Sequence, residues 1–509
     1  MMGYQPSQQE NLFYTNIIIE ERVRKNHPLR RINELIDFEF IYKEVHDRYG
    51  SKGNVSVPPP VILKLMLLLV FYNVRSEREL METVPERLDW LWFLGYTFDS
   101  MMPDHSVLSK ARKRWGQEAF KSFFERIVFQ CVEAGLVDGK KIFMDASLID
   151  ADASNNSVID KASLKRYLHK GYQELEKRLE EKENTELTDT NYVVNSRYVS
   201  ATDPDASIVR NGGKAKLRYK THRAVDSLCE VITAVEVTAG AVDEGHKMLP
   251  LIEIHEANTG IKIDTVVADS KYGTKENFLA GKDKGINGHM PILKNSSANT
   301  ALRKGIFTEE NFVYDKRTDT FTCPAGKILK RRTLHENKQN IEYVASRKDC
   351  SPCLLKSQCT NCKTGRSLQR HVRHDDLNGM FAAAQTPQAK RDIKTRQHFM
   401  ERSFARSVRF NFDRSRWRGL WKVNIQEYLV STIQNIQTLI RNIPNPKKKA
   451  LALSCVYAES KRFTAALSSG RASLNLSFIQ AGEYSFRNLF SFFLLRFSAV
   501  EYFEDCYCG

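Results

Sequence analysis

The sequence predicts an α/β fold in which a mixed sheet is flanked by helices, preceded by an all-helical region and interrupted by a cysteine-rich insertion. Three observations support this prediction. Apolar residues recur at helical spacing up to about residue 135, short apolar runs alternate with helical segments over residues 141–293, and five of the ten cysteines lie between Cys323 and Cys362.

Residues 1–135 are predicted to form a helical domain. Three consecutive prolines precede the apolar run at residues 61–72, as expected where a helix begins. Ser76 and Glu79 have the spacing of a capping box. A later helix carries four basic residues, Lys110, Arg112, Lys113 and Arg114. They favour contact with DNA, and a solvated helix face is the alternative interpretation.

The periodicity changes at Lys140, and the elements that follow predict one sheet. Residues 141–145 and 265–269 are apolar strands that each end in an acid, and residues 215–225 and 229–238 form a hairpin. Helices are expected over residues 243–258 and from 275 onward, with a last strand over 289–293. The charged segment 161–187 indicates a solvated helix. This order of elements is typical of ribonuclease-H-like folds.

These elements divide the chain into three predicted parts. Residues 136–442 form the α/β domain after the helical domain, with residues 295–390 as the cysteine-rich insertion, and residues 443–509 form a tail. Pro444, Pro446 and the three lysines after them are typical of a linker. The tail has no periodicity or motif that indicates a role.

The charge balance favours a polyanionic partner. The chain has 77 basic against 61 acidic residues, a formal net charge of +16, which suits nucleic acid but is also found in basic proteins without such a partner. No secretory signal precedes the helical region, and the apolar runs are too short or too charged to span a bilayer. We therefore expect a cytoplasmic protein with no membrane partner.

Two aspartates and a glutamate are the candidate catalytic residues. Asp145 and Asp269 each follow an apolar run, and sites in open α/β sheets form at strand ends. A helix that carries Glu401 would aim a third acid at the same point. Mg²⁺ prefers carboxylate oxygens, and two such ions promote phosphodiester cleavage by activating the nucleophile and neutralising the leaving oxygen. Taken singly, an aspartate at a strand end is more often a turn or capping residue.

A set of motifs in a fixed order resembles a known family. From about residue 30 to 442, the chain is similar to the bacterial insertion-sequence transposases of the DDE class. The resemblance rests on the helical region through Pro103-Asp104-His105-Ser106, on Met144-Asp145-Ala146-Ser147, on Thr202-Asp203-Pro204-Asp205-Ala206, on Ala268-Asp269-Ser270-Lys271-Tyr272-Gly273, and on Met400-Glu401-Arg402-Ser403-Phe404.

The resemblance implies a ribonuclease-H-like core whose catalytic triad is Asp145, Asp269 and Glu401, with two Mg²⁺ or Mn²⁺ ions held by the same three acids. It implies cleavage and strand transfer at the terminal inverted repeats of a mobile element. The partners would be double-stranded DNA, both element ends and target, with a homo-oligomer assembled on it in the bacterial nucleoid.

One departure keeps other functions open. Family members often carry a lysine seven residues after the glutamate, and this chain has Val408 there. Arg406 or Arg409 would have to supply the phosphate contact, with a different donor geometry. A decayed transposase that only binds DNA and a related nuclease are the alternatives.

Basic residues around the predicted site suit a DNA backbone lying across it. Trp417 and Trp421 stand four residues apart, which favours packing in the core over stacking on a base. The candidate DNA-binding residues are Lys271, Arg396, Arg402, Arg406 and Arg409.

The cysteine cluster predicts a structural zinc site, with reduced, metal-free cysteines as the alternative. The cluster consists of Cys323, Cys350, Cys353, Cys359 and Cys362, and the last four form two CxxC pairs. Thiolates at such spacing can wrap a tetrahedral ion. The resemblance favours the first four as ligands and leaves Cys362 as the spare. Lysines and arginines nearby suit contact with DNA.

Overall fold

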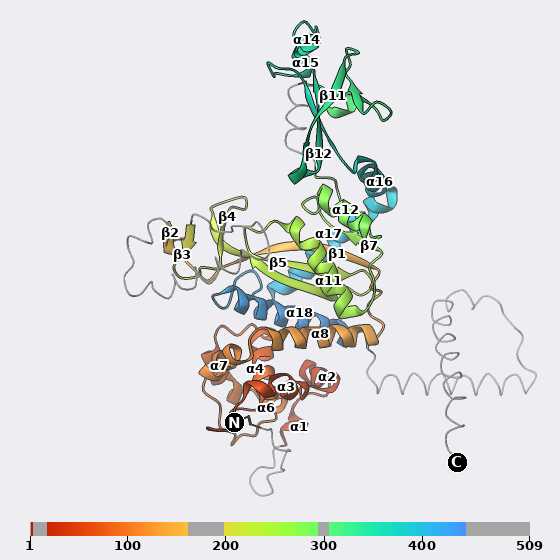
Figure 1. The fold of residues 1–509 in the computed structure, drawn as a ribbon. Helices are drawn as coiled ribbons and strands as arrows, with labels where there is room; N and C mark the ends of the chain where they lie inside the picture. Colours follow the sequence, from red (N-terminus) through yellow and green to blue (C-terminus); the bar gives the residue numbers. More distant parts are fainter. Residues whose placement is uncertain (1, 4–17, 161–197, 294–304, 444–509) are drawn as a thin grey trace, which may run out of the picture. The chain divides into compact units, whose positions relative to one another are not determined.

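The computed structural model describes residues 2–3, 18–160, 198–293 and 305–443 (Figure 1). Residues Met1–Ile443 belong to one compact unit. The helix expected over residues 161–187 lies outside the described residues, as does the tail from residue 444. In the part of the chain that the structure describes, no helix is long and apolar enough to cross a membrane.

The N-terminal region is helical, as predicted. Helix α4 is buried from residue 59 to 70 and forms its centre. The Ser76 hydroxyl accepts a 3.1 Å hydrogen bond from the backbone N–H of Glu79, which confirms the predicted cap of the next helix. The helices are α1 (Ile19–Arg22), α2 (Pro28–Leu35), α3 (Phe40–Val45), α4 (Pro59–Phe71), α5 (Glu77–Thr83), α6 (Leu88–Leu94), α7 (Ser106–Trp115) and α8 (Glu118–Glu133).

A mixed sheet follows, with six strands among the described residues. Its strands are β1 (Lys141–Asp150), β4 (Ser207–Val209), β5 (Lys216–Asp226), β6 (Ile232–Ala239), β7 (Thr265–Val267) and β8 (Asn287–His289). The order is β4-β5-β1-β7-β8, with β6 also paired to β5. Strand β1 is antiparallel to β5 and parallel to β7, which is parallel to β8. This mixed α/β arrangement has the predicted ribonuclease-H-like character.

Helices cover the sheet on both sides. They are η5 (Glu244–Lys247), α11 (Met248–Thr259), α12 (Lys275–Asp283), α16 (His374–Ala384), α17 (Pro387–Val408) and α18 (Leu420–Asn442). Helix α11 packs against β6 and β5, and α17 packs against β1, β7 and β8. Helix α18 lies between the sheet and the N-terminal helices, in contact with β6, α8 and α4 (Figure 1).

The N-terminal helices and the α/β region share one hydrophobic core. That core extends without a break from Leu29 and the residues of α4 to Val423, Leu429 and Leu439 of α18. Packing is therefore continuous across the predicted boundary near residue 135. The boundary itself stays a prediction, because it marks a change in element type and not a gap in the core.

Buried polar contacts fix the two long helices on the sheet. Arg223 of β5 is fully buried, and its Nε lies 2.5 Å from a carboxylate oxygen of buried Glu427 on α18. The same guanidinium donates to the Ser407 hydroxyl of α17 over 2.8 Å. Removing one partner would leave a buried charge uncompensated, so this contact strongly constrains how α17 and α18 sit against β5.

The Asp203-Pro204-Asp205 segment caps α18. Asp203 accepts from the backbone N–H of Gly419 at 3.1 Å, and Asp205 accepts from that of Leu420 at 2.8 Å. Two carboxylates thus meet the positive end of the helix dipole. These acids hold the start of a long helix, in keeping with the turn role expected for an acid–proline–acid sequence.

The cysteine-rich region contains a second sheet that the periodicity did not reveal. Its strands are β9 (Val313–Asp315), β10 (Thr320–Thr322), β11 (Ile328–His335), β12 (Asn340–Ala345) and β13 (Ser367–His371), in the order β13-β12-β11-β10-β9. Two short helices, α14 (Arg347–Cys350) and α15 (Lys356–Cys359), follow β12. A small core that includes Phe321, Leu329 and Tyr343 supports this sheet.

Two predicted strands differ from the structure. The strand expected over residues 289–293 is β8 at Asn287–His289, because Pro291 lacks the N–H that a paired strand needs. The strand expected to end at Asp145 continues to Asp150, since β5 pairs with it along its whole outer edge. A separate two-stranded antiparallel sheet of β2 (Val158–Asp160) and β3 (Tyr198–Ser200) was not predicted.

Candidate active site

Asp145 and Asp269 lie at the point where the parallel pairing of β1 and β7 stops. The last registered pair of these strands is Phe143 with Val267. Each aspartate stands two residues beyond that pair, and side chains two residues apart in a strand point to the same face. The two acids predicted from strand-like runs are therefore brought to one place by the register of the sheet.

A third acid that the sequence reading missed joins them. One carboxylate oxygen from each of Asp145, Glu244 and Asp269 lies within 4.8 Å of the other two. We call these residues the acid cluster. Within the described residues, it is the one group of three or more metal-type ligands this close together. Carboxylate oxygens at this spacing fit a hard divalent cation such as Mg²⁺.

Glu244 reaches the cluster because two loops are packed together. It begins η5, just after the turn that follows β6, and a Cβ added at Gly245 would lie 3.0 Å from the Lys271 carbonyl oxygen. The Asn277 side-chain amide donates to the carbonyls of both Gly245 and Tyr272, at 2.8 and 2.9 Å. In the sequence, the feature that could have pointed to Glu244 is the glycine after it. Gly245 allows the backbone of this turn to approach the backbone at Lys271 closely.

Three basic side chains offset the charge of the acid cluster. An Nη atom of Arg396 lies 2.9 Å from Asp145, and the Nζ atoms of Lys271 and Lys220 lie 2.6 and 3.2 Å from the same oxygen of Glu244. Cations at these distances favour ionised carboxylates. In the structure, Arg396 and Lys271 are thus partners of the acids, although both were predicted to contact DNA.

Burial and charge shift two pKa values in the site. Burial raises the pKa of Asp145 to about 6, against the opposing effect of Arg396. Burial alone would lower the pKa of Lys271, but its hydrogen bond to Glu244 and the charges of the acids outweigh this and raise the pKa. The burial of Asp145 thus opposes its ionisation, while the cations beside the cluster offset part of its negative charge.

Glu401 lies on α17 but outside the acid cluster. The buried face of α17 includes Arg396, Met400 and Ser403, and it is Arg396 that reaches Asp145. Glu401 is exposed and accepts a 2.9 Å hydrogen bond from the side-chain amide of Gln397. The structure brings two of the three predicted catalytic acids together, and the role of Glu401 stays a prediction.

Basic residues near the end of α17 are partly engaged within the protein. Arg402 and Arg406 lie 2.5 and 2.7 Å from the carboxylate of Glu230. Arg409 is exposed. Arg402 and Arg406 would have to leave Glu230 before they could contact DNA, whereas Arg409 already presents its charge to the solvent.

Trp417 has a structural role. Its indole N–H donates to Glu77 over 3.2 Å, and the guanidinium of buried Arg112 lies 4.1 Å from the ring centre. Arg112 also forms an ion pair with Glu77. These contacts join the N-terminal helices to the segment before α18. One of the four basic residues of the predicted DNA-contacting helix is therefore buried in this contact.

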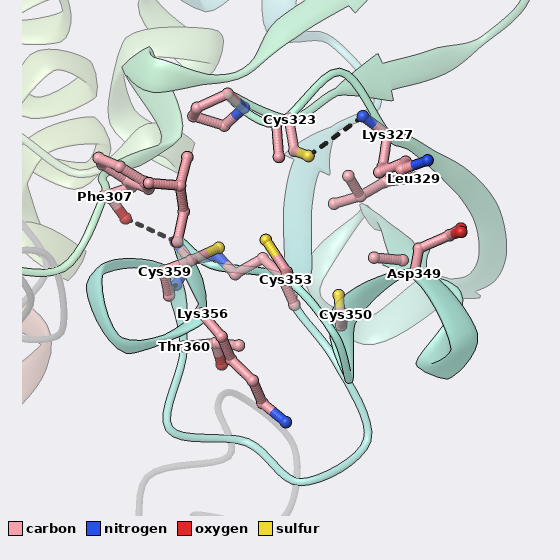
Figure 2. A pocket seen from close by; sticks show the side chains of 15 residues that line it. Phe307, Cys323, Lys327, Leu329, Asp349, Cys350, Cys353, Lys356, Cys359 and Thr360 are labelled. Atoms are coloured by element: carbon pink, nitrogen blue, oxygen red, sulfur yellow. Dashed lines mark hydrogen bonds between the residues drawn. The ribbon is translucent and has the colours of Figure 1, made fainter.

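Four of the five clustered cysteines line one pocket. Figure 2 shows Cys323, Cys350, Cys353 and Cys359 around it, and Phe307 and Leu329 also line its wall. Cys362 is exposed and contacts the Thr364 hydroxyl instead.

The sheet order, with carboxylates gathered where β1 and β7 part, defines a ribonuclease-H-like core of the DDE type. Comparison with protein families agrees. Residues 17–114 match the family described as Transposase domain (DUF772), and residues 322–440 match the family described as Transposase DDE domain. The two matched segments support an insertion-sequence DDE transposase. No curated protein matches the chain.

Only the second match reaches residues of the candidate site, because the first one ends at residue 114. The second matched segment contains Glu401 and the cysteine pocket but neither Asp145 nor Asp269. The acid cluster is therefore an observation independent of that match, whereas Glu401 rests on the matched segment and on its motif.

Proposed function

We propose that this transposase is an active enzyme that cleaves DNA at the terminal inverted repeats of an insertion sequence and transfers the cut strand to a target. The observation that carries the proposal is the convergence of Asp145 and Asp269 with a third carboxylate at the open end of the β1–β7 pairing. A homo-oligomer assembled on the element ends and target DNA is part of the same proposal.

The acids of the site would hold two Mg²⁺ or Mn²⁺ ions. Such ions activate an attacking water or 3′-hydroxyl and neutralise charge on the leaving oxygen. Asp145 on β1 and Asp269 just after β7 present their oxygens to one point, which would help to position the reacting phosphate. Lys271 stands at the rim with its side chain 60% exposed, so it is placed to meet a phosphate oxygen of bound DNA.

Glu401 is proposed as the remaining catalytic acid on the strength of its motif. Its helix packs directly against β1 and β7, which supports a position near the site. Arg402, Arg406 and Arg409 on the same helix segment, together with Arg396, are proposed to contact the DNA backbone once it occupies the site.

We also propose a structural zinc ion in the cysteine pocket. The thiols of Cys323, Cys350, Cys353 and Cys359 face one pocket in a region whose own core is small. Soft thiolates select zinc over the oxygen-preferring ions of the acid cluster. Closing the sulfurs around one ion would tie α14 and α15 to the turn after β10 and stabilise the second sheet.

The test is cleavage of labelled DNA that carries the ends of the flanking element, with Mg²⁺, with Mn²⁺ and without metal. Asp269→Ala should lower cleavage on the order of a thousandfold or more, because it removes a residue that acts as a unit with its neighbours. Asp264→Ala, an exposed acid beside the start of the same strand, is the matched control and should cleave normally.

Each other outcome identifies an alternative. Binding to the element ends without cleavage in either metal would indicate a decayed transposase. Cleavage without joined products would indicate a nuclease. Equal cleavage by Asp269→Ala and wild type would remove the acid cluster from the mechanism.

A further inference from the structure

A buried tyrosine hydroxyl points to a ligand at the acid cluster. Tyr272 is fully buried, and among the described residues its hydroxyl has no hydrogen-bond partner. Burial raises the pKa of Tyr272, and the charges of Glu244, Asp145 and Asp269 raise it further, so the side chain is within electrostatic range of all three acids. Buried hydroxyls are seldom left unpaired, so a bound ion with its water shell is a fitting partner.

The position of the Glu244 carboxylate is unfavourable for a group with only a structural role. It is 3% exposed and close to two other acids, so like-charge repulsion adds to the cost of burial. The two lysines that offset this cost, Lys220 and Lys271, bind the same carboxylate oxygen. Such an arrangement suits a carboxylate that exchanges one cation for another.

We propose that Glu244 is a third protein ligand of the divalent-metal site, with Asp145 and Asp269, and that Lys271 is the counter-charge displaced from Glu244 when the metal binds. The inference rests on the proposed function only in taking the acid cluster as the metal site. It assigns a ligand that neither the strand-end pattern nor the DDE motif provides.

Several contacts hold Glu244 for this role. Asp243 accepts the backbone N–H of Gly245 at 3.0 Å, which shapes the turn, and Asn277 binds the carbonyls of both loops. Lys220 also donates to the Val242 carbonyl at 2.9 Å, so it keeps a partner if Glu244 turns to a metal. Lys271 has its side chain mostly in solvent and can leave at little cost.

The test is Mn²⁺ binding to the full-length protein without DNA, followed by the electron paramagnetic resonance signal of free Mn²⁺. Glu244→Gln and Asp269→Asn should each weaken binding by about tenfold or more, since even residues around a ligand contribute that much. Glu253→Gln is the matched control, because it removes an exposed acid from the adjoining helix α11.

A second variant keeps the test decisive if Glu244→Gln does not fold. Lys271→Ala removes the competing cation at an exposed position, and it should tighten Mn²⁺ binding several-fold. Unchanged or weaker binding by Lys271→Ala would overturn the displacement. Wild-type affinity in folded Glu244→Gln, or no Mn²⁺ binding by the wild type, would overturn the ligand assignment and leave a structural Lys220–Glu244–Lys271 contact.

This outcome is separable from that of the proposed function. Mn²⁺ binding that depends on Glu244, in a protein that cuts no DNA, would support the ligand and reject the active enzyme. Conversely, cleavage that requires Asp269 but is unaffected by Glu244→Gln, together with unchanged Mn²⁺ binding in that variant, would support the active enzyme and reject Glu244 as a ligand.

Discussion

The acid cluster and the cysteine pocket are both sets of metal-type ligands, but they are assembled in opposite ways. Asp145, Glu244 and Asp269 come from three separate segments and meet because β1 and β7 are parallel neighbours and two loops interlock. The pocket cysteines lie within residues 323–359, and three of the four are on or between two adjacent short helices. A ligand set made by sheet topology is therefore hard to recognise from spacing, whereas one made by local turns is easy.

The two sites also differ in their state without a metal. Like charges gather in the acid cluster, so it needs Arg396, Lys220 and Lys271 as counter-charges. Thiols can stay neutral, and burial raises the pKa of Cys359, which favours the neutral form. Without a metal, the acid cluster thus lowers the stability of the fold, whereas the cysteine pocket only lacks the stabilisation that a metal would add.

The largest expected effect concerns the cysteine pocket. Cys353→Ser should reduce bound zinc from about one ion per chain to none, because a structural site needs all four ligands. The second sheet should then be cleaved readily by protease between residues 313 and 371, since metal binding supplies much of the stability of small metal domains. Mn²⁺ binding at the acid cluster should be unchanged.

Zinc analysis of the purified protein and limited proteolysis make this measurement. Wild-type protein without zinc, and with the same proteolysis pattern as the variant, would contradict the structural zinc. Loss of Mn²⁺ binding in Cys353→Ser would contradict the independence of the two sites.

A smaller effect follows from the raised pKa of Asp145. Burial raises the pKa of Asp145 in the folded protein to about 6, above the ordinary value of an aspartate, so ionisation is penalised in the folded state. This loss of folding stability is absent below the pKa of Asp145 in the unfolded chain. It grows as the pH rises towards 6 and is complete above that pH. Without metal, Asp145→Asn should therefore be more stable than wild type at pH 7.5 by roughly 1–2 kcal/mol, and equal to it at pH 4.

Urea denaturation at the two pH values, with and without Mn²⁺, measures this difference. Mn²⁺ should stabilise the wild type more than the variant, because a ligand stabilises only the state that binds it. A less stable Asp145→Asn protein at pH 7.5 would show that the ion pair with Arg396 outweighs burial.

The smallest expected effect is at the fifth cysteine. Cys362→Ser should leave zinc content and thermal stability unchanged, because Cys362 is exposed and lies outside the pocket. A loss of zinc equal to that in Cys353→Ser would show that Cys362 is a ligand and that the pocket rearranges on binding.

Sequence patterns predicted the elements that carry regular periodicity. The buried helix at Pro59–Phe71, the hairpin of β5 and β6, and the strand before Asp269 were all expected. The second sheet was not, because most of its longest strand, β11, is exposed and has no alternation of apolar and polar residues. Short strands with a small core leave little trace in the sequence.

The candidate site was predictable only in part. Asp145 and Asp269 follow apolar runs, a local signal, but their meeting depends on which strands pair. Glu244 is the first residue of η5, directly after the capping residue Asp243, and resembles an ordinary acid of a first helical turn. The intramolecular partners of Arg396 and Arg402 were hidden as well, because a basic residue in sequence gives no indication of an acid 172 or more positions away.

Helix α18 has a consequence for how the protein is made. Its apolar residues complete the core of the N-terminal helices, yet α8 ends at Glu133 and α18 only at Asn442. At about 5–20 residues per second, the ribosome needs on the order of 15–60 s to synthesise the intervening chain. During that time the nascent N-terminal helices lack their packing partner. A gene copy interrupted before codon 420 would thus yield a proteolysis substrate and not a stable DNA-binding competitor.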